Sequence, residues 1–335
     1  MLMTAIPAAM HLLVDGLCVC CLYLLSSSLE TLQSLEASPT MLQSPEASPT
    51  MLQSFVGLFL TYNVLAFLTQ PLTGAMADRM ERRHWLLLAS LLLLTGGVTA
   101  TLFAARQGTL SATLFAVSTL LGLGNSLFHV WGGKLVALTT GNDMRALGVF
   151  VSTGAMGLAL GVVYFSWSLV CVFLMALCVF ALSYLHLDSR KESDVTGTVA
   201  KRFPLWAIIA AITALTGFVM LRSLVGETFS ACVVKGHAMV LLIGVVAMLG
   251  KMAGGWIARA MGIARSMALV VALVAACMVL CRNGIWVILA GLFLVNCTMP
   301  VTLYLANVVL KGHEGLAFGL LAAALIPGYL LAVYG

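Results

Sequence analysis

The sequence predicts an all-α membrane protein that crosses the bilayer many times. Of its 335 residues, 61% are hydrophobic and only 9% are charged, whereas a soluble domain carries about 25% charged residues. The apolar segments are long and continuous rather than alternating, which indicates membrane helices and not the strands of a membrane barrel. A helix satisfies its own backbone hydrogen bonds in lipid. We therefore expect a polytopic bundle of transmembrane helices.

Eleven apolar segments have about the length that a membrane span needs, which is roughly 20 residues. In chain order, we expect spans at 5–27, 54–76, 85–105, 110–138, 147–165, 167–187, 205–226, 236–258, 266–281, 285–309 and 314–334. The polar segment 188–204 divides them into six and five. This division predicts an N-terminal bundle over 1–187, a cytoplasmic linker over 188–204 and a C-terminal bundle over 205–335.

The basic residues are distributed unequally between alternate loops. If the loop 77–84 is placed in the cytoplasm, the cytoplasmic loops contain Arg79, Arg82, Arg83, Arg145, Arg190, Lys191, Lys201, Arg202, Arg259, Arg265 and Lys311. The outside loops contain Arg106, Lys235 and Arg282. Because Lys and Arg favour the cytoplasmic side, we expect a multi-pass plasma-membrane protein, such as one of the bacterial inner membrane, with a cytoplasmic N-terminus.

The first outside loop, 28–53, contains a tandem repeat of ten residues. LQSLEASPTM at 32–41 is followed by LQSPEASPTM at 42–51. Such a Ser-, Pro- and Glu-rich segment cannot bury a core, so we expect it to be flexible. It is either a surface segment for binding or modification, or a duplication without a function of its own. The second interpretation is favoured.

Several function classes lack their sequence features. There is no nucleotide-binding Gly-rich loop, no group of metal ligands with a recognised spacing and no nucleophile–base pair. We therefore expect neither an enzyme nor an ATP-driven pump, and no cofactor or resident metal. The basic residues form no clustered face, so we expect no nucleic-acid partner.

Ionisable side chains inside the spans are costly in lipid and indicate functional sites. His11 and Asp15 lie four residues apart and share one helical face, as do Asn125 and His129. Asp15 could carry a proton across the membrane, and histidine titrates near neutral pH. The alternative for Asp15 and His129 is a structural hydrogen bond between helices.

Further polar candidates lie in the seventh and tenth spans. Arg222 could pair with a carboxylate or bind an anionic substrate, or could reach the outer interface by snorkelling. Asn296 and Tyr304 complete the expected set of proton-coupling and cavity residues. We expect Lys134 and Lys251 to snorkel to the inner face.

The loop after the second span carries the most specific pattern of the chain. Residues 70–83 read QPLTGAMADRMERR. The loop resembles the one between the second and third spans of major facilitator superfamily transporters, whose pattern is roughly G-x-L-A-D-R-x-G-R-R-x-x-L. The matching residues are Gly74, Ala77, Asp78, Arg79, Arg82, Arg83 and Leu86, whereas Met76 replaces Leu and Glu81 replaces the second Gly. An ordinary basic loop is the alternative.

This resemblance implies a role for the loop in gating. Asp78 can cap the N-terminus of a neighbouring helix, and such contacts would hold the two bundles together on the cytoplasmic side. We assign Gly74, Asp78, Arg79 and Arg83 to this gate.

Internal repeats agree with the superfamily resemblance. Asn125 and Gly148 recur as Asn296 and Gly319 at an offset of 171 residues. Gly74 and Ala77 recur as Gly255 and Ala258 at an offset of 181, where Arg259 replaces the acidic residue and Gly262 occupies the position of Glu81. The superfamily fold has two pseudo-repeated six-helix halves with a substrate site near the midplane. The expected eleven spans, six and five, lack a twelfth.

A narrower resemblance rests on MHLLVDGL (10–17), Gln70-Pro71 and GLGNSLFH (122–129). These segments resemble the fosmidomycin-resistance branch of the superfamily, although Val130 stands where Pro is common. The resemblance implies proton-coupled efflux of drugs or metabolites by alternating access. The expected partners are a small-molecule substrate, protons and the lipid bilayer, with a monomeric transporter. Proton-coupled nutrient uptake and a truncated, non-transporting protein with the same fold are the alternatives.

Overall fold

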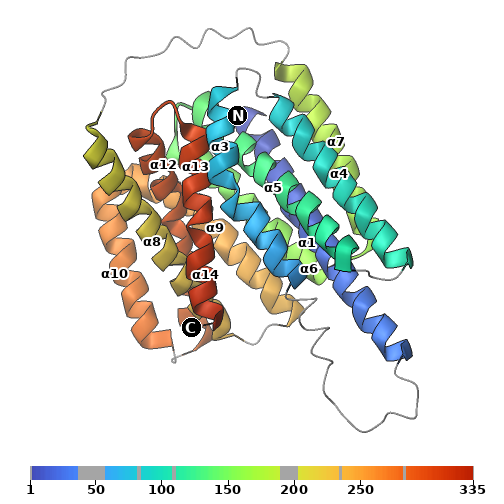
Figure 1. Ribbon diagram of the computed structural model, residues 1–335. Coiled ribbons are helices and arrows are strands. Elements are labelled where there is room, and N and C mark those ends of the chain that lie inside the picture. The colour runs from blue at the N-terminus through green and yellow to red at the C-terminus, as the bar shows by residue number, and fades with distance from the viewer. Residues whose placement is uncertain are drawn as a thin grey trace.

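The computed structural model describes residues 2–36, 57–80, 84–107, 111–188, 203–233, 236–281 and 284–334. Its regular elements in these ranges are all helices (Figure 1). Arg83, residues 37–51 of the tandem repeat and residues 189–202 of the expected linker lie outside the described residues.

The helices follow the expected order of spans. The first half comprises α1 (Leu2–Glu36), η1 (Val64–Leu68) with α3 (Gln70–Arg79), α4 (His84–Gln107), α5 (Ser111–Thr139), α6 (Met144–Val163) and α7 (Trp167–Asp188). The second half comprises α8 (Leu205–Ala231), α9 (His237–Met261), α10 (Ile263–Leu280), α11 (Ile285–Cys297) with α12 (Met299–Val309), and α13 (Glu314–Ala323) with α14 (Leu325–Tyr334). Ten stretches of the described chain are long and apolar enough to cross a membrane. The remaining expected span, the second at 54–76, corresponds to the interrupted helix that starts at residue 57 and ends with α3.

Three spans are interrupted close to a proline. Proline has no N–H and its ring clashes with the carbonyl four residues earlier, so it breaks a helix. Pro71 follows the π-helical turn η1, Pro300 follows the break between α11 and α12, and Pro327 follows the break between α13 and α14. Each interrupted span therefore consists of two short helical pieces.

Apolar residues cover both the interior and the outer surface, as lipid requires. The larger core cluster centres on the first half, whereas a smaller cluster around Phe229 and Leu292 holds part of the second half. Leu92, Trp206 and Trp286 are each more than 70% exposed. The two chain ends lie at opposite ends of the bundle (Figure 1), as an odd number of crossings requires.

The two halves touch through glycines that the internal repeats relate. A side chain at Gly74 of α3 would collide with the carbonyl of Gly315 in α13. Adding 181 to position 74 gives Gly255 of α9, and subtracting 171 from position 315 gives Met144 of α6. A side chain at Gly255 would likewise collide with the carbonyl of Met144. The pair formed by Gly319 and Gln70 is likewise repeated by Gly148 and Lys251. These matched contacts indicate two pseudo-equivalent bundles that pack closely at the end where α3 terminates.

Candidate functional site

A cavity of about 380 Å³ lies between the two bundles. The first half contributes residues of α1, η1, α5 and α6, and the second half contributes residues of α8, α9 and α12–α14. A second cavity of about 360 Å³ shares Arg222, Glu227, Lys251 and other residues with it. The two spaces therefore form one continuous depression between the halves of the molecule.

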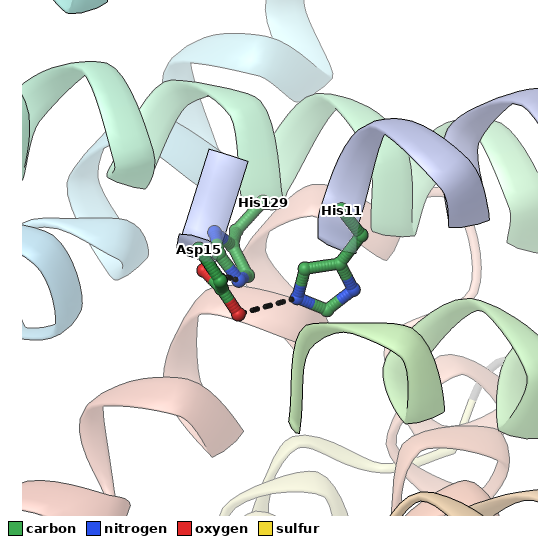
Figure 2. A group of neighbouring side chains, drawn as sticks. All are labelled: His11, Asp15 and His129. Carbon is green, nitrogen blue, oxygen red and sulfur yellow. Dashed lines mark ion pairs between the residues drawn. The ribbon is translucent and has the colours of Figure 1, made fainter. Parts of the chain in front are cut away.

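A polar cluster from α1 and α5 forms one wall of this cavity (Figure 2). Asp15 lies between two imidazoles, with its Oδ2 3.2 Å from Nε2 of His11 and its Oδ1 3.5 Å from Nε2 of His129. The side-chain amide of Asn125 also donates to Asp15 Oδ1 at 3.0 Å. His11 and Asp15 share a face of α1, and Asn125 and His129 share a face of α5, because each pair is separated by four residues. The tertiary fold then brings the two pairs together.

Backbone carbonyls fix the orientation of both imidazoles. Nδ1 of His11 is 2.7 Å from the carbonyl oxygen of Phe150, and Nδ1 of His129 is 2.9 Å from the carbonyl oxygen of Asn125. A carbonyl oxygen only accepts, so each Nδ1 carries the hydrogen. In a neutral imidazole, Nε2 then has only a lone pair to present to Asp15, and an ionised carboxylate also only accepts. The 3.2 Å contact of His11 with Asp15 therefore favours a proton between the two atoms, whereas the 3.5 Å distance from His129 is longer than a usual hydrogen bond.

Glycines of α6 leave the space in which this cluster fits. A side chain at Gly154 would collide with both His11 Nε2 and Asp15 Oδ2, and one at Gly157 would collide with the carbonyl of Leu12. Small residues allow membrane helices to approach closely. Close packing at these glycines thus positions α1 against α6 and brings Phe150 to His11.

The opposite wall of the cavity is basic. Arg222 of α8 is buried, being 9% exposed, and Lys251 of α9 is half-buried. Both side chains line the cavity. Lys251 was expected at the inner face, but ten residues separate it from the end of α9 at Met261, a rise of about 15 Å. That depth is too great for a lysine head group to reach the interface. The distance of Lys251 from the end of its span is thus the feature of the sequence that could have identified it as a cavity residue.

The remaining polar residues of the expected set lie apart from the cluster. Asn296 lines the adjoining cavity and donates its side-chain amide to the carbonyl of Leu292. Tyr304 is not among the residues that line the main cavity, and its backbone carbonyl accepts a hydrogen bond from Asn142 at 3.1 Å.

Asp78 joins the two bundles beyond the end of the cavity. Its side chain is 2% exposed, and its carboxylate accepts the backbone N–H groups of Gly315 at 2.9 Å and Leu316 at 2.8 Å. These N–H groups belong to the first turn of α13, where a negative charge is stabilised. Lys134 does not snorkel. Its ammonium group is buried, lies 3.1 Å from Oδ1 of Asp78 and donates a hydrogen bond to the carbonyl of Ala77. Arg79 is exposed at the end of α3.

The cluster of His11, Asp15 and His129 also offers three potential metal ligands within 4.8 Å of one another. Two imidazoles and a carboxylate suit Zn²⁺, and carbonyl acceptors on the far ring nitrogens are typical of such ligands. Arg222 and Lys251 line the same cavity. Their positive charges oppose any bound cation, and they oppose a divalent metal ion more strongly than a single proton.

Comparison with known proteins gives the following similarities. A family model described as the Major Facilitator Superfamily matches residues 19–333. The human organic anion transporter MFSD10 (TETRAN) is 18% identical, with a TM-score of 0.63 over 98% of this chain and 92% of its own. The E. coli fucose:proton symporter FucP is 14% identical, with a TM-score of 0.58 over 96% of this chain and 90% of its own. FucP in the outward conformation gives the same identity and TM-score over 95% and 90% of the two chains.

At these identities, the solved structures show a common fold and nothing more about function. No curated protein sequence is significantly similar to this chain.

Proposed function

The chain belongs to the Major Facilitator Superfamily, and on that premise we propose that it is a proton-coupled secondary transporter that exports small organic molecules by alternating access. Family membership makes it a multi-pass membrane protein of a transporter family. The proposal adds the coupling ion and the direction of transport. The observation that supports it most is the position of Asp15 between two imidazoles, because a proton shared by Asp15 and His11 would stabilise their 3.2 Å contact.

The position of the proton site supports coupling to a substrate. Asp15, His11 and His129 lie in the cavity wall, so a molecule in the cavity can contact the groups that hold the proton. Entry of a substrate can displace the proton, and loss of the substrate can restore it. If substrate and proton exclude each other from the cavity, this exclusion is sufficient for exchange of protons against substrate.

We further propose that Asp78 forms the cytoplasmic gate. The excess of basic residues in the loops on this side supports a cytoplasmic location for the Asp78 end and for the N-terminus. Asp78 connects α3 of the first bundle to α13 of the second, and Gly74 lets the two helices touch. The structure then corresponds to a state whose cavity is closed toward the cytoplasm. Residues His11, Asp15, Gln70, Pro71 and His129 also support a place in the fosmidomycin-resistance branch.

The test is a proton-flux assay with the purified full chain in proteoliposomes that contain a pH-sensitive dye. The variants are Asp15→Asn and, as a matched control, Glu314→Gln, which removes a carboxylate from an exposed turn. We expect a panel of drugs and metabolites to trigger proton flux in the wild type and the control but not in Asp15→Asn. Substrate-triggered proton flux at the wild-type rate in Asp15→Asn would disprove the proposal.

The same assay distinguishes export from uptake. In an exporter of this kind, protons and substrate move in opposite directions across the membrane. Movement of both in the same direction would instead assign proton-coupled uptake.

A further inference from the structure

The basic wall of the cavity lacks a partner. Among the residues that the structure describes, no carboxylate lies within 4.0 Å of the guanidinium of Arg222 or the ammonium of Lys251. The Nε of Arg222 is buried without a hydrogen-bond partner in the described part of the chain. A buried charge without a partner is costly. An anion that binds between Arg222 and Lys251 therefore stabilises the protein.

The acidic residues of the cavity do not neutralise this wall. Asp15 already contacts His11, His129 and Asn125. Glu227 of α8 also lines the cavity, but none of the ion pairs among the described residues joins it to Arg222 or Lys251. The two cations are thus available to a molecule that enters from outside the protein.

Most of the remaining lining is apolar, although Asn63, Ser223 and Thr302 add polar groups. It consists mainly of aliphatic and aromatic side chains from both bundles, among them Val151, Leu158, Val219, Leu303, Phe318 and Leu321. The cavity volume of about 380 Å³ lies in the range of roughly 300–1,000 Å³ that is usual for sites of drug-sized ligands. A ligand that fits this surface has an apolar body and a single charged end.

We propose that the transported molecule is an organic anion whose acidic group binds between Arg222 and Lys251. The guanidinium can donate two parallel hydrogen bonds to a carboxylate or phosphonate, and the ammonium adds a compact positive charge. The apolar body then contacts the aliphatic lining. This inference rests on the proposed function, because it takes the cavity as the transport site.

The experiment measures binding rather than transport. The purified full chain is titrated with compounds that have a phenyl, naphthyl or octyl body and end in a carboxylate, a phosphonate, a carboxamide or an ammonium group. Dissociation constants are obtained from the rise in Tm, because a ligand that binds only the folded protein stabilises it. We expect the acids to bind at least about tenfold more tightly than the amides and ammonium compounds on the same body.

The variants Arg222→Gln and Lys251→Met should each weaken acid binding at least about tenfold, since each removes a charged hydrogen-bond donor. Arg259→Gln is the matched control, because Arg259 is an exposed residue of α9 outside the cavity. If Arg222→Gln does not fold, Arg222→Lys replaces it in the experiment, together with Lys251→Met at the more exposed of the two positions. The Lys variant keeps the charge but loses the planar fork, so we expect an intermediate loss.

Three results would overturn this inference. They are amides or ammonium compounds that bind as tightly as the acids, an absence of binding by every acid, and unchanged acid binding in both the Arg222 and Lys251 variants. Failure of the proposed function is distinguishable from these results. Acids that bind but never exchange for protons would refute proton-coupled export alone, whereas proton-coupled export of neutral compounds without acid binding would refute the substrate class alone.

Discussion

The contact of Asp78 with α13 permits a quantitative prediction about the gate. Asp78→Asn keeps one acceptor oxygen, so it can retain only one of the two hydrogen bonds that the two carboxylate oxygens accept from α13. It removes the negative charge from the N-terminus of α13, where Gly315 and Leu316 donate their N–H groups. It also removes the partner of Lys134.

The loss can be estimated from these contacts. A charge at a partly buried helix end contributes about 1 kcal/mol, and breaking a buried ion pair costs about 3–5 kcal/mol. Lys134 keeps its hydrogen bond to the carbonyl of Ala77, so we expect the loss to be smaller than the sum of these two terms, which is about 4–6 kcal/mol. We expect the closed arrangement to weaken by about 3 kcal/mol, which is about a 100-fold change in the ratio of closed to open states.

Hydrogen exchange measured by mass spectrometry tests this value directly. We expect the peptide over residues 311–323 to exchange about 100-fold faster in Asp78→Asn, because local protection reports the free energy of opening. The transport rate should fall while the protein remains inserted in the membrane. Glu314→Gln, in the same helical turn, should change exchange by no more than about threefold, as is usual for surface substitutions. Unchanged protection of this peptide in Asp78→Asn would refute the role of Asp78 in closing the gate.

Two further predictions concern stability. Gly157→Ala should lower the stability by about 1–3 kcal/mol, seen as a lower Tm, because the new methyl group collides with the carbonyl of Leu12. Gly217→Ala, where a side chain meets open space, should not, and equal Tm values would contradict the packing argument. Asp143→Ala removes the N-cap of α6 and should cost about 1 kcal/mol at pH 7. Hydrogen bonds from Arg145 hold the pKa of Asp143 below its usual 3.8, so its stabilisation is present above that pH and lost as the pH falls below it. The difference in Tm from the wild type should shrink between pH 7 and pH 3, and a constant difference would contradict this account.

Local patterns were sufficient to predict the spans and the faces of individual helices. The spacing of His11 and Asp15, and that of Asn125 and His129, placed each pair on one side of its helix. It could not show that both pairs meet at one point, because that contact depends on how α1 and α5 pack. The role of the Phe150 carbonyl in orienting His11 was likewise invisible, since a backbone atom has no signal in the sequence.

The lysines show why hydropathy alone misplaces charged residues. Lys134 and Lys251 occupy similar positions in a hydropathy profile, and both were expected at the inner face. In the structure, Lys134 pairs with Asp78 and Lys251 lines the cavity. Depth along the helix and the repeat offset, which maps Lys251 onto Gln70 of the Gln-Pro pair, carry information that a count of apolar residues does not.

The interrupted helices give the two walls of the cavity different stiffness. The wall that carries His11, Asp15 and His129 is built from the continuous helices α1, α5 and α6. Much of the facing wall is built from α12, α13 and α14, which are short pieces that end at breaks near Pro300 and Pro327. Because a break removes hydrogen bonds from a helix, we expect the pieces α12, α13 and α14 to yield more readily to a bound molecule than α1, α5 and α6. If the proposed function holds, substrates of different size can then be accommodated on the side of the interrupted helices, while the positions of His11, Asp15 and His129 stay unchanged.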